Sequence, residues 1–77
     1  MKESIKDLRK VRENKGLSLS QLSKLTGINK STLQRYETGA TQKVYIDDII
    51  ALDLALNYPF MYKRYIEYIE IKNKKNV

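Results

Sequence analysis

The sequence predicts an all-α protein, a compact bundle of five helices that occupies residues 1–77 as a single domain. Apolar residues recur at helical spacing in five segments, and no segment alternates as a convincing β-strand would. Glycine, asparagine and proline stand between these segments, where helices begin and end. Because the chain has no cysteine to form disulfides, its small core must come from well-packed helices.

The first predicted helix begins at Ser4, which is followed by Asp7 in a helix-start pattern, and ends near Lys15. Gly16 is available as its left-handed cap. Its apolar positions recur at helical spacing, at Ile5, Leu8 and Val11.

The second helix is predicted to begin at Ser18, because Ser18 and Gln21 have the spacing of a capping box. Gly27 permits a positive φ in the turn that follows, and Ile28 can pack beneath that turn. The apolar stripe of this helix is expected to be buried and consists of Leu19, Leu22 and Leu25.

The third helix is predicted from about Lys30 to Thr38, capped by Asn29 and ended by Gly39. Its inward-facing residues are Leu33 and Tyr36. Two short helices joined by a turn of three or four residues form a helix-turn-helix, whose second helix enters the major groove of DNA. Residues 18–39 therefore predict a helix-turn-helix at the centre of the bundle.

The outward face of the third helix carries four polar residues with a reason to be near base edges, namely Lys30, Ser31, Gln34 and Arg35. Lysine and arginine can donate to guanine, glutamine can pair bidentately with adenine, and serine can donate or accept. These four are the candidate base-reading residues. The alternative is a solvated helix face, since any exposed helix is polar.

The fourth helix, over about 45–56, is apolar over a wide arc and is expected to be central and buried on several sides. Its apolar residues are Ile46, Ile49, Ile50, Leu52, Leu54 and Leu56. Asn57 and Tyr58 end it, and Pro59 suits the first position of a fifth helix. This aromatic helix is predicted over 58–72, with a frayed basic tail over 73–77.

Apolar residues circle more than half of the fifth helix, which exceeds what one small core can bury. Exposed aromatic surface of this kind usually marks an interface. We therefore predict a homodimer interface, formed by Tyr62, Tyr65, Ile66 and Ile69. The alternatives are that this helix completes the monomer core or binds a different protein.

The net charge of the chain indicates which kinds of partner it can bind. Fifteen lysines and arginines against nine acidic residues give a net charge of +6 and a pI near 9.6. A basic domain attracts polyanions, so nucleic acid and anionic membrane surfaces are the candidates.

No apolar run could span a bilayer and residues 1–10 lack a secretory signal, which predicts a cytoplasmic protein without a membrane partner. Without histidine or cysteine, no catalytic residues, metal site or cofactor are expected.

Three stretches resemble the phage repressor and Cro helix-turn-helix family, the XRE-like transcriptional regulators with a lambda repressor-like DNA-binding domain. They are LRKVRENKGLS at 8–18, LSKLTGINKSTLQRYETG at 22–39 and IIALDLAL at 49–56. The resemblance covers about residues 5–57, in the right order and with nearly the right spacings. It implies a sequence-specific double-stranded DNA-binding regulator that represses transcription by occupying a palindromic operator as a homodimer. The family also implies base contacts by Lys30, Ser31 and Arg35, with Gln34 as the neighbouring candidate.

Contacts to the DNA backbone are expected from residues around the base-reading face. The resemblance implies one from Asn29 and an ion pair between Arg12 and Glu37 that can leave the Arg12 guanidinium facing a phosphate. Lys43, in the loop after the third helix, is well placed for a backbone contact. Three other basic residues of the first helix face either DNA or water, namely Arg9, Lys10 and Lys15.

The chain departs from the family pattern at two positions that bear on function. Leu19 replaces the usual glutamine that bonds a phosphate, so that contact is lost or moves to Ser18, Ser20 or the helix amides. Asp53 replaces a common alanine and is expected to be a structural carboxylate rather than a functional one. Ser23 in place of the usual alanine is a mild change.

Two rival functions remain open. One is a helix-turn-helix protein-interaction module, such as an antirepressor or adaptor, that uses the aromatic helix and has little DNA preference. The other is a nonspecific nucleoid-type binder, which would keep the salt dependence of DNA binding without sequence discrimination. An enzyme is not expected, because no set of residues has catalytic spacing.

Overall fold

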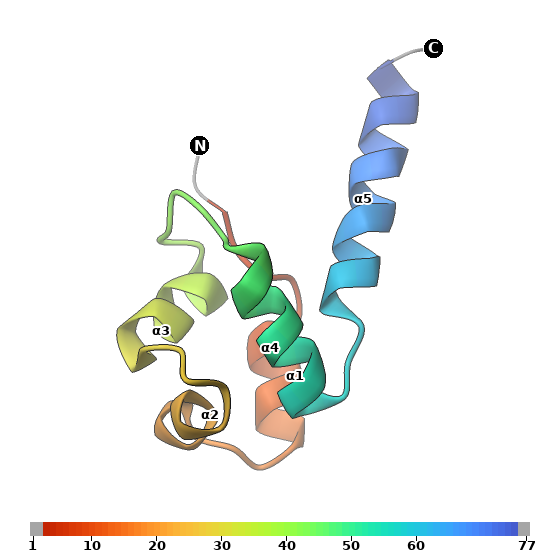
Figure 1. The fold of residues 1–77 in the computed structure, drawn as a ribbon. Coiled ribbons are helices and arrows are strands. Elements are labelled where there is room, and N and C mark those ends of the chain that lie inside the picture. Colours follow the sequence, from red (N-terminus) through yellow and green to blue (C-terminus); the bar gives the residue numbers. More distant parts are fainter. Residues whose placement is uncertain (1–2, 76–77) are drawn as a thin grey trace.

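The computed structural model describes residues 3–75, which form five α-helices around one core (Figure 1). In chain order these are α1 Leu8–Asn14, α2 Leu19–Thr26, α3 Lys30–Thr38, α4 Ile46–Leu56 and α5 Phe60–Lys75. The predicted all-α class is confirmed. The described residues contain one antiparallel bridge, between Glu3 and Thr41, but no strand. None of the five helices is long and apolar enough to cross a membrane.

The first helix begins later than predicted, at Leu8 rather than Ser4. Ser4 and Ile5 lie outside any helix, and the Ile5 N–H donates to the carbonyl of Tyr36 at 2.9 Å. Asp7 has a left-handed backbone with φ 66°, and its side chain makes no capping hydrogen bond. Ile5 is nevertheless buried, so the apolar spacing identified a core residue but not its backbone conformation.

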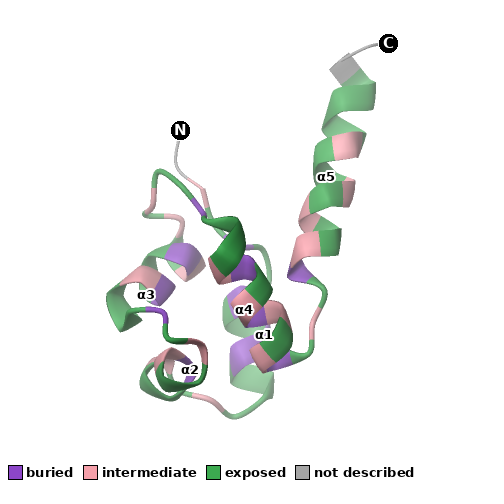
Figure 2. Ribbon diagram, in the orientation of Figure 1, coloured by how far each residue is buried: buried purple, intermediate pink, exposed green. Residues whose placement is uncertain are grey.

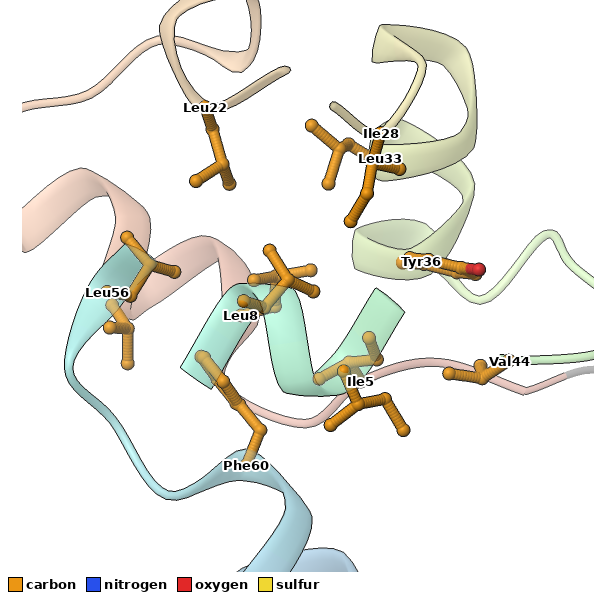
Figure 3. Packing of buried hydrophobic residues seen from close by; sticks show 12 residues of the cluster. Ile5, Leu8, Leu22, Ile28, Leu33, Tyr36, Val44, Leu56 and Phe60 are labelled. Atoms are coloured by element: carbon orange, nitrogen blue, oxygen red, sulfur yellow. The ribbon is translucent and has the colours of Figure 1, made fainter. Parts of the chain in front are cut away.

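The core collects side chains from the segment before α1, from every helix and from two loops (Figure 3). Its buried members are Ile5, Leu8, Val11, Leu22, Ile28, Leu33, Tyr36, Val44, Ile49, Leu52, Leu56 and Phe60. α4 packs against α2 and α5, whereas α3 packs against α2 and α1. Figure 1 shows α3 and α5 at opposite edges of the bundle, with α1 and α4 between them.

The prediction that α4 is buried on several sides is wrong. The exposed fractions of Ile46, Ile50 and Leu54 are 60%, 45% and 81%. One face of α4 packs into the core, and the apolar face opposite it meets solvent (Figure 2). On α2 the prediction fails in the same way at Leu25, which is 61% exposed although Leu22 is fully buried.

The turn between α4 and α5 explains the role of Asp53. Asn57 ends α4 in a left-handed conformation with φ 49°. α5 then begins at Phe60, directly after Pro59 and two residues after the start of the predicted span 58–72. The Asp53 carboxylate accepts hydrogen bonds from the backbone N–H groups of Phe60 at 2.9 Å and Met61 at 3.3 Å. Asp53 therefore caps the start of α5, which confirms the structural role predicted for it.

α5 projects from the bundle instead of completing its core (Figures 1 and 2). Among residues 60–74 only Phe60 is buried, and Met61 packs at the core edge. Of the predicted interface residues, Tyr62 and Tyr65 are 65% and 58% exposed, and the remaining two, Ile66 and Ile69, are half-buried. The helix continues to Lys75, so the tail predicted over 73–77 is helical at 73–75, and 76–77 lie outside the described residues.

The segment before α1 ties α5 to the rest of the molecule. Its Glu3 N–H donates to the Thr41 carbonyl at 2.8 Å, in the loop after α3. The Glu3 carboxylate forms an ion pair with Arg64 of α5, which also donates to the Ser4 carbonyl at 3.2 Å. Because one short segment contacts both elements, the direction in which α5 projects is fixed relative to α3.

Candidate nucleic-acid interface

The helix-turn-helix is built by short-range hydrogen bonds. The capping box predicted at the start of α2 is present, since the Gln21 N–H donates to Ser18 Oγ at 3.1 Å and the Ser18 N–H donates to Gln21 Oε1 at 2.8 Å. Gly27 follows α2 with φ 77°, a conformation costly for residues with a Cβ. The Ser23 hydroxyl donates to the Ile28 carbonyl at 2.6 Å, so this serine bridges the turn.

Asn29 caps α3 with its side-chain oxygen. Asn29 Oδ1 accepts from the Ser31 N–H at 2.9 Å and from the Ser31 hydroxyl at 2.7 Å. The Ser31 hydroxyl proton is therefore already committed within the protein, and Ser31 is left with its oxygen as an acceptor. The Asn29 amide N–H groups stay available to a phosphate. α3 ends at Gly39, where φ is 80°.

An ion pair fixes α3 from α1. Arg12 donates to the Glu37 carboxylate through Nε at 2.6 Å and through Nη2 at 3.1 Å. A third donor, Nη1, bonds the Leu17 carbonyl at 2.8 Å. The hydrogen bonds to Glu37 raise the pKa of Arg12 above its ordinary value. Arg12 is only 9% exposed, so the structure supports its predicted ion pair, whereas the predicted phosphate contact would need an exposed guanidinium.

Tyr36 fixes α3 from α4. Its ring is buried in the core, and its hydroxyl donates to the carboxylate of Asp48 in the first turn of α4. Burial first, and then this hydrogen bond, raise the pKa of Tyr36 to about 12. Together with the Arg12–Glu37 pair, this contact fixes the inner side of α3 to α1 and to α4.

The raised pKa predicts a loss of stability at high pH. Because Tyr36 ionises near 10.0 when unfolded and at about 12 when folded, its contribution is complete below pH 10 and disappears as the pH rises to about 12. Two pKa units correspond to roughly 3 kcal/mol of unfolding free energy. Denaturant titrations at several pH values should show this decline, and Tyr36→Phe should flatten it. An equally steep decline in Tyr36→Phe would contradict the assignment to this hydroxyl.

The predicted base-reading residues share the outer side of α3. Lys30, Ser31, Gln34 and Arg35 are all exposed, while Leu33 and Tyr36 of the same helix are buried. The ion pairs found among residues 3–75 involve neither Lys30 nor Arg35. The outer side of α3 therefore combines free positive charge with a rigidly held backbone, at an edge of the bundle that a DNA groove can reach (Figure 1).

Residues on either side of α3 extend the polar surface. Lys43 is exposed, and its ammonium lies 5.2 Å from the centre of the Tyr45 ring, which orients it by a cation–π contact. Tyr45 is itself 56% exposed and was not predicted as a site residue, since sequence position alone does not distinguish it from core tyrosines. Ser18 is also exposed at the start of α2.

The start of α2 offers a second residue that sequence reasoning missed. Leu19 packs against the core and cannot replace the phosphate-binding glutamine. Gln21 is exposed and uses only its side-chain oxygen in the capping box, so its amide N–H groups are free to donate. The capping-box spacing that identified the helix start was also the signal for this residue.

Comparison with known families agrees with this geometry. The chain belongs to the helix-turn-helix family (HTH_3), whose sequence profile matches residues 8–63. It is an XRE-like helix-turn-helix protein, and the kind of function that this family defines is that of a DNA-binding transcription regulator. Comparison with curated proteins and with solved structures gives no significant match.

Proposed function

We propose that the protein is a sequence-specific repressor that binds a palindromic operator in double-stranded DNA as a homodimer and acts by occupying it. The observation that carries this proposal is the two-sided character of α3. Its inner face is held by the core, by Arg12 and by Asp48, while Lys30, Gln34 and Arg35 face outward. A reading helix needs such rigidity, because base-edge hydrogen bonds depend on fixed geometry.

Within this proposal the contacts divide into two groups. Lys30, Gln34 and Arg35 read bases, with Ser31 as an acceptor only. The backbone is held by the remaining exposed polar groups, which are Ser18, Gln21, Asn29, Lys43 and Tyr45. Arg12 acts through Glu37 and positions α3 without touching DNA.

The proposal is tested by selecting binding sites from a randomised duplex pool and measuring binding of the winner across salt concentrations. Enrichment of a two-fold symmetric motif is expected. Binding without enrichment would instead indicate a nonspecific binder, whose affinity depends on salt but not on sequence.

A protein-interaction module is the second candidate function, because α5 leaves Tyr62, Tyr65 and Tyr68 more than half exposed. This function predicts no binding of the duplex pool at moderate salt. It also predicts that alanine is tolerated on the outer face of α3.

Arg35→Ala is expected to weaken operator binding by about 1–3 kcal/mol and to relax the preference at one base pair. The reason is the loss of a planar donor that can contact guanine at two points. Titration against operators varied one position at a time measures both effects. Arg35→Lys is the matched control: it keeps the charge, so its discrimination should fall more than its nonspecific affinity. Equal losses on every sequence would contradict base reading by Arg35.

Lys43→Ala is expected to weaken binding to all sequences alike and to lower the slope of log affinity against log salt by about one. A phosphate contact releases a counterion but reads no base. Lys43→Arg should keep the slope. A change in sequence preference in Lys43→Ala would show that this side chain reaches base edges.

A further inference from the structure

The exposed face of α4 is apolar along its length. Ile46, Ile50 and Leu54 stand four residues apart, so they follow one line on the helix surface, and each is at least 45% exposed. We call these three residues the α4 stripe. At 1.5 Å per residue the stripe extends about 12 Å from Ile46 to Leu54. Within the described chain the stripe has no cover, although apolar surface of this kind usually has a binding partner.

α5 carries an apolar surface of similar length. Tyr62, Tyr65, Ile66 and Ile69 have the i, i+3, i+4, i+7 spacing of one helix face. This α5 stripe extends about 10 Å at the same rise per residue. It lies on a helix that projects from the bundle (Figure 1), and the ion pairs of Glu3 with Arg64 and of Lys6 with Glu67 hold that helix in place. A rigid, projecting amphipathic helix is suited to lie against an apolar face of another molecule.

The charges beside the two stripes are complementary. α4 has no basic residue and three acidic ones, at Asp47, Asp48 and Asp53. The carboxylates of Asp48 and Asp53 accept hydrogen bonds from Tyr36 and from the start of α5, whereas Asp47 is exposed beside the stripe. α5 has an excess of basic residues, and its exposed Lys72 and Lys74 lie in the part that projects furthest. An acidic margin on one stripe and a basic end on the other favour pairing between unlike helices over pairing of like helices.

From these observations we infer that in the homodimer α5 of one copy docks on the α4 stripe of the other copy. This inference rests on the proposed function, which includes the homodimer. The partner is a second copy because the chain itself supplies both complementary surfaces, and two-fold symmetry covers both stripes of both copies at once. Direct pairing of two α5 helices would leave the α4 stripes in solvent.

The test uses cysteine crosslinking, which the absence of natural cysteines makes specific. Ile50 is the middle residue of the α4 stripe, and Tyr65 lies near the middle of the α5 stripe. Mixing Ile50→Cys protein with Tyr65→Cys protein under mild oxidation should give a disulfide-linked heterodimer. Tyr65→Cys mixed with Leu25→Cys is the matched control and should give none, because Leu25 is more exposed than Ile50 but lies outside the α4 stripe.

Two outcomes would contradict the docking of α5 on the α4 stripe. They also show whether the homodimer itself exists. Tyr65→Cys crosslinking only to itself would mean that the dimer exists through α5 alone. A wild-type protein that sediments as a monomer would remove the homodimer as well. As an independent measurement, Ile50→Lys with Leu54→Lys should raise the dimer dissociation constant at least tenfold, with Leu25→Lys unchanged. Unchanged dimerisation of the double variant would contradict the docking.

Discussion

Glu37→Ala is expected to lower the free energy of unfolding by about 3–5 kcal/mol. Both charged side chains of the pair are buried, with exposed fractions of 11% for Arg12 and 4% for Glu37. Removing the carboxylate leaves the guanidinium buried without its two charge-assisted hydrogen bonds. A small domain has only about 5–15 kcal/mol of stability, so much of the population would unfold near physiological temperature.

Chemical denaturation followed by circular dichroism measures this loss of stability. Two further variants serve as controls. Arg12→Met with Glu37→Leu removes both charges and should recover most of the stability, because apolar pairs of similar volume often replace buried ion pairs without loss. Glu13→Ala breaks the exposed pair with Arg9 and should change stability by no more than about 0.5 kcal/mol. A loss below about 1 kcal/mol in Glu37→Ala would mean that water reaches Arg12 and that the pair is not the anchor of α3.

The parts of the fold that could be predicted are those determined by neighbouring residues. The caps at Ser18 and Asn29 and the left-handed positions at Gly16 and Gly27 were each predicted, and each depends on interactions within a few residues. Long-range contacts decide the rest. The helix start predicted at Ser4 is wrong because Asp7 has a left-handed backbone, and the Ile5 N–H before it bonds a carbonyl more than thirty residues away in α3.

The same distinction applies to the candidate site. The outer face of α3 followed from helical spacing alone, and its four residues are exposed as that spacing requires. The burial of Arg12 and the bond that occupies the Ser31 hydroxyl depend on the folded geometry, so the sequence could not show which of these donors are already used within the protein. The free amide donor of Gln21 could have been predicted from the capping box, because a glutamine that accepts from a backbone N–H must use its side-chain oxygen.

The exposed leucines and isoleucines are the most instructive errors. A helix that is apolar all round is expected to be buried, but the pattern does not say whether its own chain or another covers it. For Ile46 and Leu54 the monomer supplies no cover. In the proposed homodimer a second copy would cover these side chains and the exposed tyrosines of α5, which the isolated monomer leaves in solvent.

Replacing Tyr65 and Ile69 together by aspartate is expected to give a folded monomer whose operator affinity is lower by about 10²–10⁴-fold. In a dimer the second half-site binds at a high effective concentration, and that advantage disappears when the copies separate. The fold should survive because Tyr65 is 58% exposed and Ile69 is half-buried, with neither in the buried core.

Sedimentation measures the loss of the dimer, and operator titration measures the loss of affinity. Binding to an isolated half-site tests whether each single copy still binds DNA. Affinity for an isolated half-site should stay close to that of the wild type, since α3 is untouched. Lys24→Asp on α2 changes the net charge by the same amount, two units, at an exposed position outside both stripes, and should leave the dimer intact. A double variant that still sediments as a dimer would show that the copies associate through another surface. Loss of half-site binding would instead show that α5 supports the reading helix within one copy.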